Sequence, residues 1–492
     1  MNIFNNMHRR FALAVLTLSV VFTSCQKYLD VNVDPNRSLT TTPQLALTSS
    51  QLYIGQSIGD RVASQSNVWN QYWTTGPGTA LGTWDQNSML TSDGNQLFNT
   101  FYLRSLNGLN YIIKKTNQPV YAAIAKILMA YEYQYAVDLF GDVPFSEALK
   151  GDIEDGALTS PKYDDAQVVY NAIITLVDEG ISALDTTGTG FIYPSSDDII
   201  FGGDLIKWKA FAYSLKLKLY MRQSGIKDVS AEVQEIYENG FFLEDLAAIR
   251  YTSASPKNAN PLWYDLKSSI GNTYAASKTS IDYLISTDDP RIDYFYNKAS
   301  ATNTHVGLKQ GDVENSPASA SYSTPNGARA TNGGIIFGPD VPVILMSPWE
   351  VNFLLAEAAA KGYIAENDES LYEDAVTLNF QYFGTPGVST YLSNGGAYDN
   401  TSLETKIKSI ALQKWVSFNG TQTVESWIET RRLDSPANPV FTSAGGIFMV
   451  PTNNVLGGSA FPSIYYYPQT EADFNTKFPG QNQLTDKVFW DN

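Results

Sequence analysis

Cysteine and histidine are almost absent from this chain of 492 residues, which contains one cysteine, Cys25, and two histidines, His8 and His305. A single cysteine cannot form an intramolecular disulfide, so the stability of the fold must come from its core. Two imidazoles and one thiol are too few ligands for a typical zinc or transition-metal site. We therefore expect neither a metal nor another cofactor.

Basic residues and long apolar runs are also scarce. The chain has 33 Lys and Arg against 50 Asp and Glu, a formal net charge of −17. This excess of acid repels phosphate backbones and anionic membrane surfaces, so nucleic acid is not an expected partner. No apolar run approaches the roughly 20 residues that a membrane-spanning helix requires. Any membrane attachment must therefore have another origin.

The first 25 residues suggest that origin. Arg9 and Arg10 precede the apolar run Phe11–Phe22, and two small residues then lead to Cys25. This order of charged, apolar and small residues predicts a secretory signal over residues 1–24. A cysteine at the cleavage point resembles the lipobox of bacterial lipoproteins, in which the thiol is acylated, for example with palmitate. We expect Cys25 to be lipidated; an ordinary signal peptide with an incidental cysteine is the alternative.

The remainder divides into a short polar segment and a long helical region. The segment that follows Cys25, up to Pro43, is polar and predicts a tether, so residues 25–43 form the lipidated N-terminus. We expect residues 44–492 to form a single α-rich domain. Apolar residues recur there at spacings of three and four, and Ser347 to Glu350 has the sequence of a capping box. The predicted helices, which come in pairs and favour stacked hairpins, are Val120–Phe140, Asp165–Leu184, Asp204–Arg222, Pro348–Gly362, Leu403–Phe418 and Val424–Arg432.

Long irregular stretches are expected between these helices, where loops of such length are usually functional or disordered. They are Trp69–Trp84, Thr252–Gly271, Ser300–Pro339 and Pro386–Thr401. Two short apolar runs, Gly334–Phe337 and Ile464–Tyr467, predict a small pair of strands as a minor β element.

One catalytic motif occurs, but its context is unfavourable. Gly55–Gly59 matches the G-x-S-x-G nucleophile elbow, which requires a strand before the serine and a histidine partner. The preceding residues are helical in pattern, and His305 lies in a polar stretch. Small residues that allow a helix to pass close to a neighbour are the favoured interpretation. A pair of catalytic carboxylates cannot be judged from sequence, because their separation is a property of the fold. A surface glycoside hydrolase therefore stays open as an alternative.

Aromatic residues are abundant, with 9 Trp, 30 Tyr and 24 Phe. Several fall in the expected loops, beside Gly, Asn and Asp. Aromatic faces combined with amide and carboxylate groups are what a sugar ring requires, since it offers both apolar C–H faces and hydroxyls. The alternative is that these rings fix the loops to the core. The candidate ligand-binding residues are Trp69, Trp73, Trp84, Trp263 and Tyr264.

Four stretches together resemble the SusD/RagB-like nutrient-binding lipoproteins of Gram-negative outer membranes. They are Tyr28–Asn36, Ala123–Leu149 with the run Asp138–Pro144, Gly203–Arg222, and the C-terminal segments Glu350–Gly362, Ile410–Trp427 and Tyr467–Gln469. The resemblance spans most of the chain.

This resemblance implies a mainly α fold in which tetratricopeptide-like helical hairpins support a loop-rich ligand-binding region. It implies a lipid-anchored, surface-exposed protein of the outer membrane that captures oligosaccharides without catalysis. It also implies delivery of the ligand to a SusC-like TonB-dependent outer-membrane barrel. Peptide-binding members of the same family remain a second possibility for the ligand.

Overall fold

The computed structural model describes residues 41–76, 84–152, 156–254, 258–267, 274–312, 317–328, 330 and 332–491. Residues 43–492 form one unit by their internal contacts. The predicted signal of residues 1–24, Cys25 and the tether up to residue 40 lie outside the described residues.

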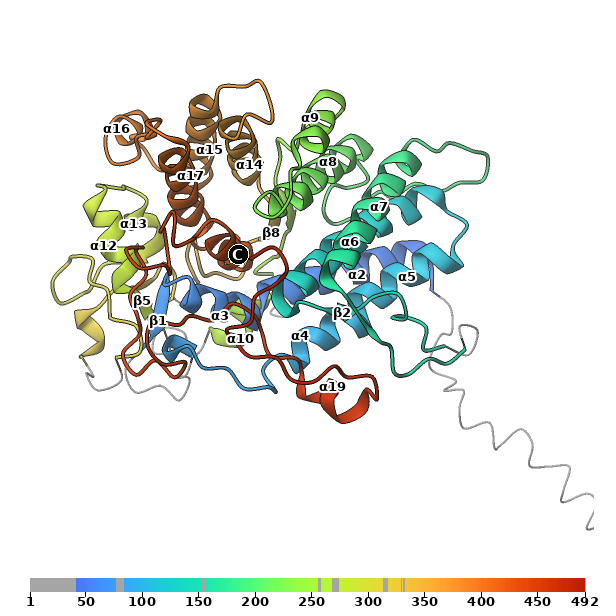
Figure 1. Ribbon diagram of the computed structural model, residues 1–492, viewed down its shortest axis with the longest axis horizontal. Coiled ribbons are helices and arrows are strands. Elements are labelled where there is room, and N and C mark those ends of the chain that lie inside the picture. The colour runs from blue at the N-terminus through green and yellow to red at the C-terminus, as the bar shows by residue number, and fades with distance from the viewer. Residues whose placement is uncertain are drawn as a thin grey trace, which may run out of the picture. The chain divides into compact units, whose positions relative to one another are not determined.

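Helix α6 (Pro119–Phe140) is the centre of this unit. Ile124, Leu128 and Tyr135 are all buried, which confirms the prediction of a central helix with these side chains inward. Its neighbours α5 (Leu106–Lys115) and α7 (Ala166–Leu184) pack against it. Figure 1 shows α6 and α7 as adjacent helices, with α14, α15 and α17 grouped in another part of the unit.

Helices account for most of the architecture, which is mainly α as expected. The other α-helices are α2 (Pro43–Gly59), α3 (Arg61–Trp69), α4 (Asn95–Asn99), α8 (Leu205–Arg222), α9 (Ser230–Asn239), α10 (Pro261–Leu266), α12 (Lys278–Ser286), α13 (Ile292–Phe295), α14 (Pro348–Ala360), α15 (Asp368–Phe383), α16 (Val388–Leu392), α17 (Leu403–Phe418), α18 (Thr423–Arg432) and α19 (Gln469–Phe474). Short 3₁₀ turns lie at Trp84–Gln86 (η1) and Ser319–Ser321 (η4), and Thr100–Ser105 (η2) is a π-helix.

Local capping explains why several helices begin where the sequence predicted. The Asp165 carboxylate accepts a hydrogen bond from the Val168 N–H at the start of α7, and Asp204 does the same for Ile206 in α8. Ser347 accepts from the Glu350 N–H at the start of α14. The Glu350 carboxylate points away from this cap and contacts Lys218, so it belongs to the buried network described below.

The strands are short and pair antiparallel. Within the described residues the pairs are β1 (Trp73–Thr75) with β5 (Tyr274–Ala276), β2 (Val143–Pro144) with β3 (Tyr163–Asp164), β4 (Ala247–Ile249) with β8 (Val343–Met346), and β6 (Tyr296–Asn297) with β7 (Thr324–Pro325). The predicted strands Gly334–Phe337 and Ile464–Tyr467 are wrong, because both segments are irregular. Most of their apolar side chains are buried through packing and not through a ladder, whereas Ile335 is exposed.

The G-x-S-x-G motif lies within and at the end of α2, so the strand that a nucleophile elbow requires is replaced by a helix. A Cβ atom on Gly55 would lie 2.5 Å from the Tyr251 hydroxyl, and one on Gly59 would lie 2.3 Å from Val343 Cγ2. The interpretation of these glycines as points of close approach is confirmed. They allow α2 to pass directly over strands β4 and β8.

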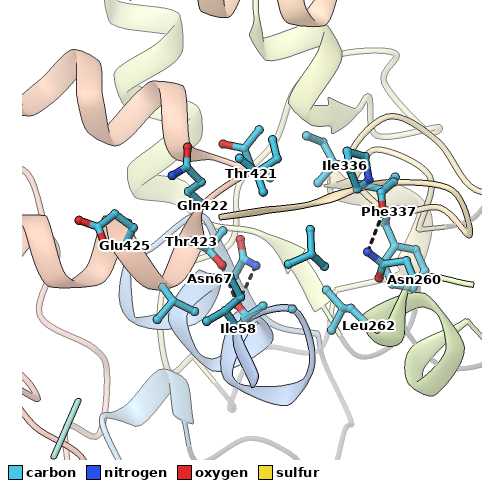
Figure 2. Close-up of a pocket in the computed structure, with 18 of the residues that line it drawn as sticks. Ile58, Asn67, Asn260, Leu262, Ile336, Phe337, Thr421, Gln422, Thr423 and Glu425 are labelled. Atoms are coloured by element: carbon cyan, nitrogen blue, oxygen red, sulfur yellow. Dashed lines mark hydrogen bonds between the residues drawn. The ribbon is translucent and has the colours of Figure 1, made fainter. Parts of the chain in front are cut away.

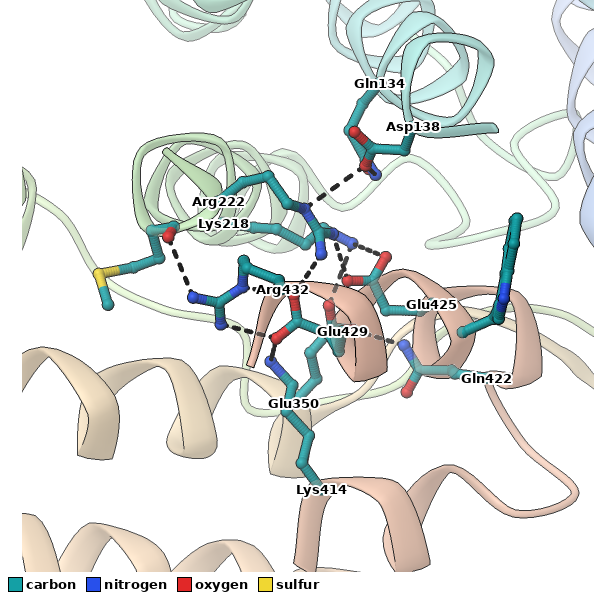
Figure 3. A network of polar contacts seen from close by, with 12 residues as sticks. Gln134, Asp138, Lys218, Arg222, Glu350, Lys414, Gln422, Glu425, Glu429 and Arg432 are labelled. Carbon is teal, nitrogen blue, oxygen red and sulfur yellow. Dashed lines mark hydrogen bonds and ion pairs between the residues drawn. The ribbon is translucent and has the colours of Figure 1, made fainter. Parts of the chain in front are cut away.

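Charged side chains from α6, α8, α14, α17 and α18 meet inside the protein, which the sequence did not indicate (Figure 3). Lys218 Nζ lies 3.0 Å from Glu350 Oε1, and Lys414 Nζ lies 2.6 Å from Glu429 Oε2. Arg222 contacts both Glu425 and Glu429. Burial raises the pKa of Glu350, whereas at Glu429 the raising effect of burial is outweighed by Arg432, Lys414 and Arg222, which lower its pKa. Buried charges are tolerated here because each has an opposite partner.

Candidate ligand-binding site

Two cavities lie beside the junction of α2 and α3, and they share the wall formed by Asp60, Arg61 and Trp84. The first has a volume of about 250 Å³ and extends toward α4 and Tyr465. The second, of about 290 Å³, extends toward α10 and Tyr274. Helix α10 packs against both α2 and α3, which closes the second cavity on one side.

Asp60 is the most unusual residue of this wall. It occupies the N-cap position of α3, yet its side chain makes no capping hydrogen bond to the second or third residue of that helix. The side chain is 6% exposed, and its Oδ1 atom has no hydrogen-bond partner among the described residues. Burial, followed by the nearby Asp265 carboxyl, raises the pKa of Asp60 to about 7. The Asp60 and Asp265 side chains lie within hydrogen-bonding reach of each other, so a protonated Asp60 can donate to the Asp265 carboxylate.

Gln65 supplies the complementary group in the first cavity. It lies one turn after Arg61 on α3, is 3% exposed, and its Nε2 atom has no acceptor among the described residues. A buried amide without a partner costs free energy in the empty protein, and a ligand hydroxyl can satisfy it. The first cavity therefore contains both an unpaired acceptor and an unpaired donor.

Aromatic surface completes the wall. The Arg61 guanidinium lies over the Trp84 ring, 5.3 Å from its centroid. Trp84 Nε1 approaches Asp93 Oδ2 at 3.4 Å. In the second cavity, burial raises the pKa of Tyr274 to about 12, so its hydroxyl is protonated at neutral pH and can donate.

The five predicted residues differ in how they relate to these cavities. Trp84 lines both of them. Trp69, Trp73 and Trp263 are buried, on α3, β1 and α10 respectively, and their rings contact Trp427, Tyr274 and Phe337. Tyr264 is 51% exposed and lies on α10 beside Asp265.

These placements correct the reasoning that selected the five residues. The stretches Trp69–Trp84 and Thr252–Gly271 were expected to be irregular, but they contain the end of α3, β1, η1 and α10. Helix packing and strand pairing thus explain the burial of the tryptophans. Contact of any of the five with a ligand stays a prediction. The residues that sequence reasoning missed are Asp60, Arg61, Gln65 and Tyr274, whereas Asp265 was noted as a polar neighbour of Tyr264. For Asp60, the available signal was a carboxylate between two helical patterns.

A third cavity lies between α2, α3, α18 and the segment of Ile336 and Phe337 (Figure 2). In this view Asn67 and Asn260 donate to the backbone oxygens of Ala63 and Val341. Its volume is about 50 Å³. This is space for one or two waters, at roughly 30 Å³ per water in the liquid, and far too little for a sugar ring.

A larger cavity of about 540 Å³ lies at α4, η2 and the segment Pro144–Pro161. Two polar groups on its wall have partners within the protein. The Tyr102 hydroxyl donates to the Pro144 oxygen at 2.7 Å, and Asn110 Nδ2 donates to the Leu149 oxygen at 3.2 Å. The cavities at Trp84 are the better candidate site, because their buried polar atoms lack partners.

The Trp84 cavities combine groups that suit the binding of a polar ligand. Within the described residues, no group of three or more His, Cys, Asp or Glu side chains could hold a metal ion. His305 pairs with Asp293 Oδ1 at 2.8 Å and lines neither cavity. The walls offer an aromatic ring, amides, a carboxyl pair and a guanidinium, which suit a ligand rich in hydroxyl groups.

Comparison with known proteins agrees with this architecture. The chain is similar in structure to a chitin-binding protein, with 23% identity, a TM-score of 0.75 and coverage of 92% of this chain and 100% of that chain. It is also similar to a SusD homolog from Bacteroides fragilis, with 20% identity, a TM-score of 0.73 and coverage of 92% of this chain and 100% of that chain. A SusD/RagB family protein from Bacteroides thetaiotaomicron is similar as well, with 20% identity, a TM-score of 0.73 and coverage of 92% of this chain and 99% of that chain. Identities at this level show the fold alone. No curated protein matches the chain.

None of the helices in the described ranges combines the length and apolar character that a membrane crossing requires. A model of the SusD-like family, described as starch-binding and associating with the outer membrane, matches residues 35–467. The match covers most of the chain, so this protein belongs to the SusD-like family of outer-membrane-associated nutrient-binding proteins.

Proposed function

We propose that this protein captures an oligosaccharide in the two cavities at Trp84, without catalysis, and delivers it to a SusC-like TonB-dependent transporter. The observation that carries the proposal is the pair of buried, unpartnered atoms on the cavity wall, Asp60 Oδ1 and Gln65 Nε2. A hydroxyl is both donor and acceptor, so a sugar can satisfy both atoms. Trp84 supplies the ring face that such a ligand also requires.

A glycoside hydrolase is the alternative function. Two carboxyls meet in one cavity, and burial and Asp265 raise the pKa of Asp60, which are features of catalytic sites. Retaining and inverting hydrolases hold their carboxyls roughly 5–9.5 Å apart, so that the sugar lies between them. Asp60 and Asp265 are hydrogen-bonded to each other. This leaves no space for a glycosidic bond between these two carboxyls, so the arrangement of this pair favours binding over hydrolysis.

We further propose that Cys25 carries the lipid anchor and that residues 25–43 tether a single domain, residues 44–492, at the cell surface. The support is the cysteine that follows the apolar run Phe11–Phe22. Lipid attachment is a sufficient source of membrane association when a second signal accompanies the first acyl chain.

The test is a glycan and peptide array probed with detergent-solubilised full-length protein, followed by calorimetry with the selected ligand. Gln65→Leu should weaken binding about two- to tenfold, because it removes one hydrogen-bond donor. Gln223→Leu is the matched control, since Gln223 is equally buried but lies on the wall of neither cavity.

Prolonged incubation of the same ligand with the wild-type protein should yield no shorter products. Release of shorter sugars that is lost in Asp265→Asn would favour the hydrolase. A preference for peptides over all glycans on the array would favour the peptide-binding alternative.

A further inference from the structure

The charges on the walls of the two Trp84 cavities are unequal. Asp60, Asp93 and Asp265 supply three carboxyls, whereas Arg61 is the only basic residue among the described residues of these walls. The whole chain also carries an excess of negative charge, −17. The cavities therefore lie in a negative potential, which draws cations toward them.

The carboxyl pair is the point at which a cation is stabilised most. Asp60 is almost fully buried with one oxygen unpartnered, and Asp265 is exposed on α10. Two like charges in contact repel unless something positive lies between or beside them. Without a ligand, a proton on Asp60 removes one of the two charges. Two carboxylates are too few for calcium, which takes six to eight oxygen ligands, but they suit an ammonium group with its three donors.

We propose that the Asp60–Asp265 pair is a subsite for a protonated primary amine, and that the ligand is an oligosaccharide carrying free amino groups. This inference rests on the proposed sugar-binding function of the Trp84 cavities and specifies the ligand further. The ring face of Trp84 and the amide of Gln65 hold the neutral part of such a ligand, and the carboxyl pair holds its charge.

Binding is then linked to proton release. When the ligand's ammonium group contacts both carboxylates, it replaces the proton on Asp60, which passes to the buffer. The other groups that face Asp60 do not take the place of the ligand's ammonium group. Arg61 lies over Trp84, Gln96 Nε2 donates to Asp60 Oδ2 at 3.3 Å, and Tyr251, whose pKa is raised by burial and by Asp60, remains a neutral phenol.

The experiment compares two ligands with the same backbone, a glucosamine oligomer and its fully N-acetylated form, in calorimetry with the full-length protein. At about pH 6, below the pKa of about 7 that burial gives Asp60, the Asp60 side chain holds its proton and the glucosamine amines are charged. We expect the glucosamine oligomer to bind at least about tenfold more tightly than the acetylated one, because its ammonium group makes a charge-assisted contact with the carboxylates. Repeating the titration in buffers of different ionisation enthalpy should reveal up to about one proton released per ligand.

Three variants distinguish amine binding at the carboxyl pair from a general attraction by the protein's negative charge. Asp265→Asn, at an exposed position that does not threaten the fold, should abolish both the preference and the proton release. Asp60→Asn should do the same. Asp185→Asn removes one negative charge at an exposed position at the end of α7 and should leave both unchanged.

Equal affinity for the two oligomers, or a preference that survives Asp265→Asn, overturns the inference. If a neutral glycan binds and depends on Gln65 while the glucosamine oligomer does not bind, the inference fails and the proposed function stands. If no glycan binds, both fail. Lysine-containing peptides that bind more tightly than the glucosamine oligomer overturn the assignment to a sugar.

Discussion

Replacing Glu132 with glutamine should stabilise the protein at alkaline pH. Glu132 lies fully buried on the central helix α6, where Ser57 and Ser105 contact its two carboxyl oxygens. Burial raises the pKa of Glu132 from 4.5 to about 8, although the hydrogen bonds from Ser105 and Ser57 oppose the shift. In the folded protein this side chain is therefore a neutral acid at pH 7.

The sign of the effect follows from the bound protons. Between pH 4.5 and about 8 the folded protein holds a proton on Glu132 that the unfolded chain has released, so stability falls as the pH rises through this range. The window of 3.5 pH units corresponds to a loss of about 5 kcal/mol in the free energy of unfolding, at about 1.4 kcal/mol per unit. Glutamine has the same shape but does not titrate. Its amide can donate to one serine oxygen and accept from the other.

The assay is denaturant-induced unfolding of wild type and Glu132→Gln at about pH 6 and about pH 9. We expect the variant to gain about 3 kcal/mol relative to wild type between the two conditions, because about 2 of the 3.5 pH units lie above pH 6 and all other titrating groups contribute equally to both proteins. Glu235→Gln, the same change at an exposed position of α9, controls for the loss of one carboxyl. A difference between Glu132→Gln and wild type that is the same at both pH values would refute the assignment of Glu132 as a neutral buried acid.

Three further predictions concern the core, the ion network and the anchor. Leu128→Ala should destabilise the fold by about 2–5 kcal/mol, since Leu128 is fully buried on α6, and an unchanged unfolding midpoint would contradict its central position. Burial alone would raise the pKa of Glu357, but Arg432 and Lys361 outweigh it and bring the pKa down to about 2. The ion pair therefore contributes about 3 kcal/mol to stability above pH 4.5, and this contribution is lost as the pH falls toward 2. The stability of Glu357→Gln should lack this loss between pH 4.5 and 2 in acid unfolding. Cys25→Ala should release the protein from the membrane fraction, and retention in cells that lack the transporter would show that the anchor lies elsewhere.

The helices were predictable because their signals are local. The apolar spacing of Val120–Phe140 matches α6 to within one residue, and Leu403–Phe418 matches α17. The caps at Asp165, Asp204 and Ser347 are formed by side chains within a few residues of the helix they start. Such features depend on neighbouring residues only.

The candidate site was predictable only in part, because it depends on contacts between distant segments. Asp60 and Asp265 meet when α10 packs on α3, and no sequence pattern relates the two positions. Trp73 appeared to lie in a loop, yet its strand pairs with β5 and buries the ring. Trp84 is the predicted aromatic residue that does line both cavities.

The central claim is that the cavities at Trp84 bind a glycan, and calorimetry of Trp84→Ala with the array-selected ligand tests it most directly. Loss of one aromatic face should weaken binding by about 1–3 kcal/mol, which is roughly 5- to 150-fold in affinity. Tyr193→Ala, which removes an exposed ring outside both cavities, should bind as wild type does. Melting temperatures of both variants establish that they are folded. Weakened binding by a folded Trp84→Ala is the predicted result, and unchanged affinity of that variant would contradict the claim.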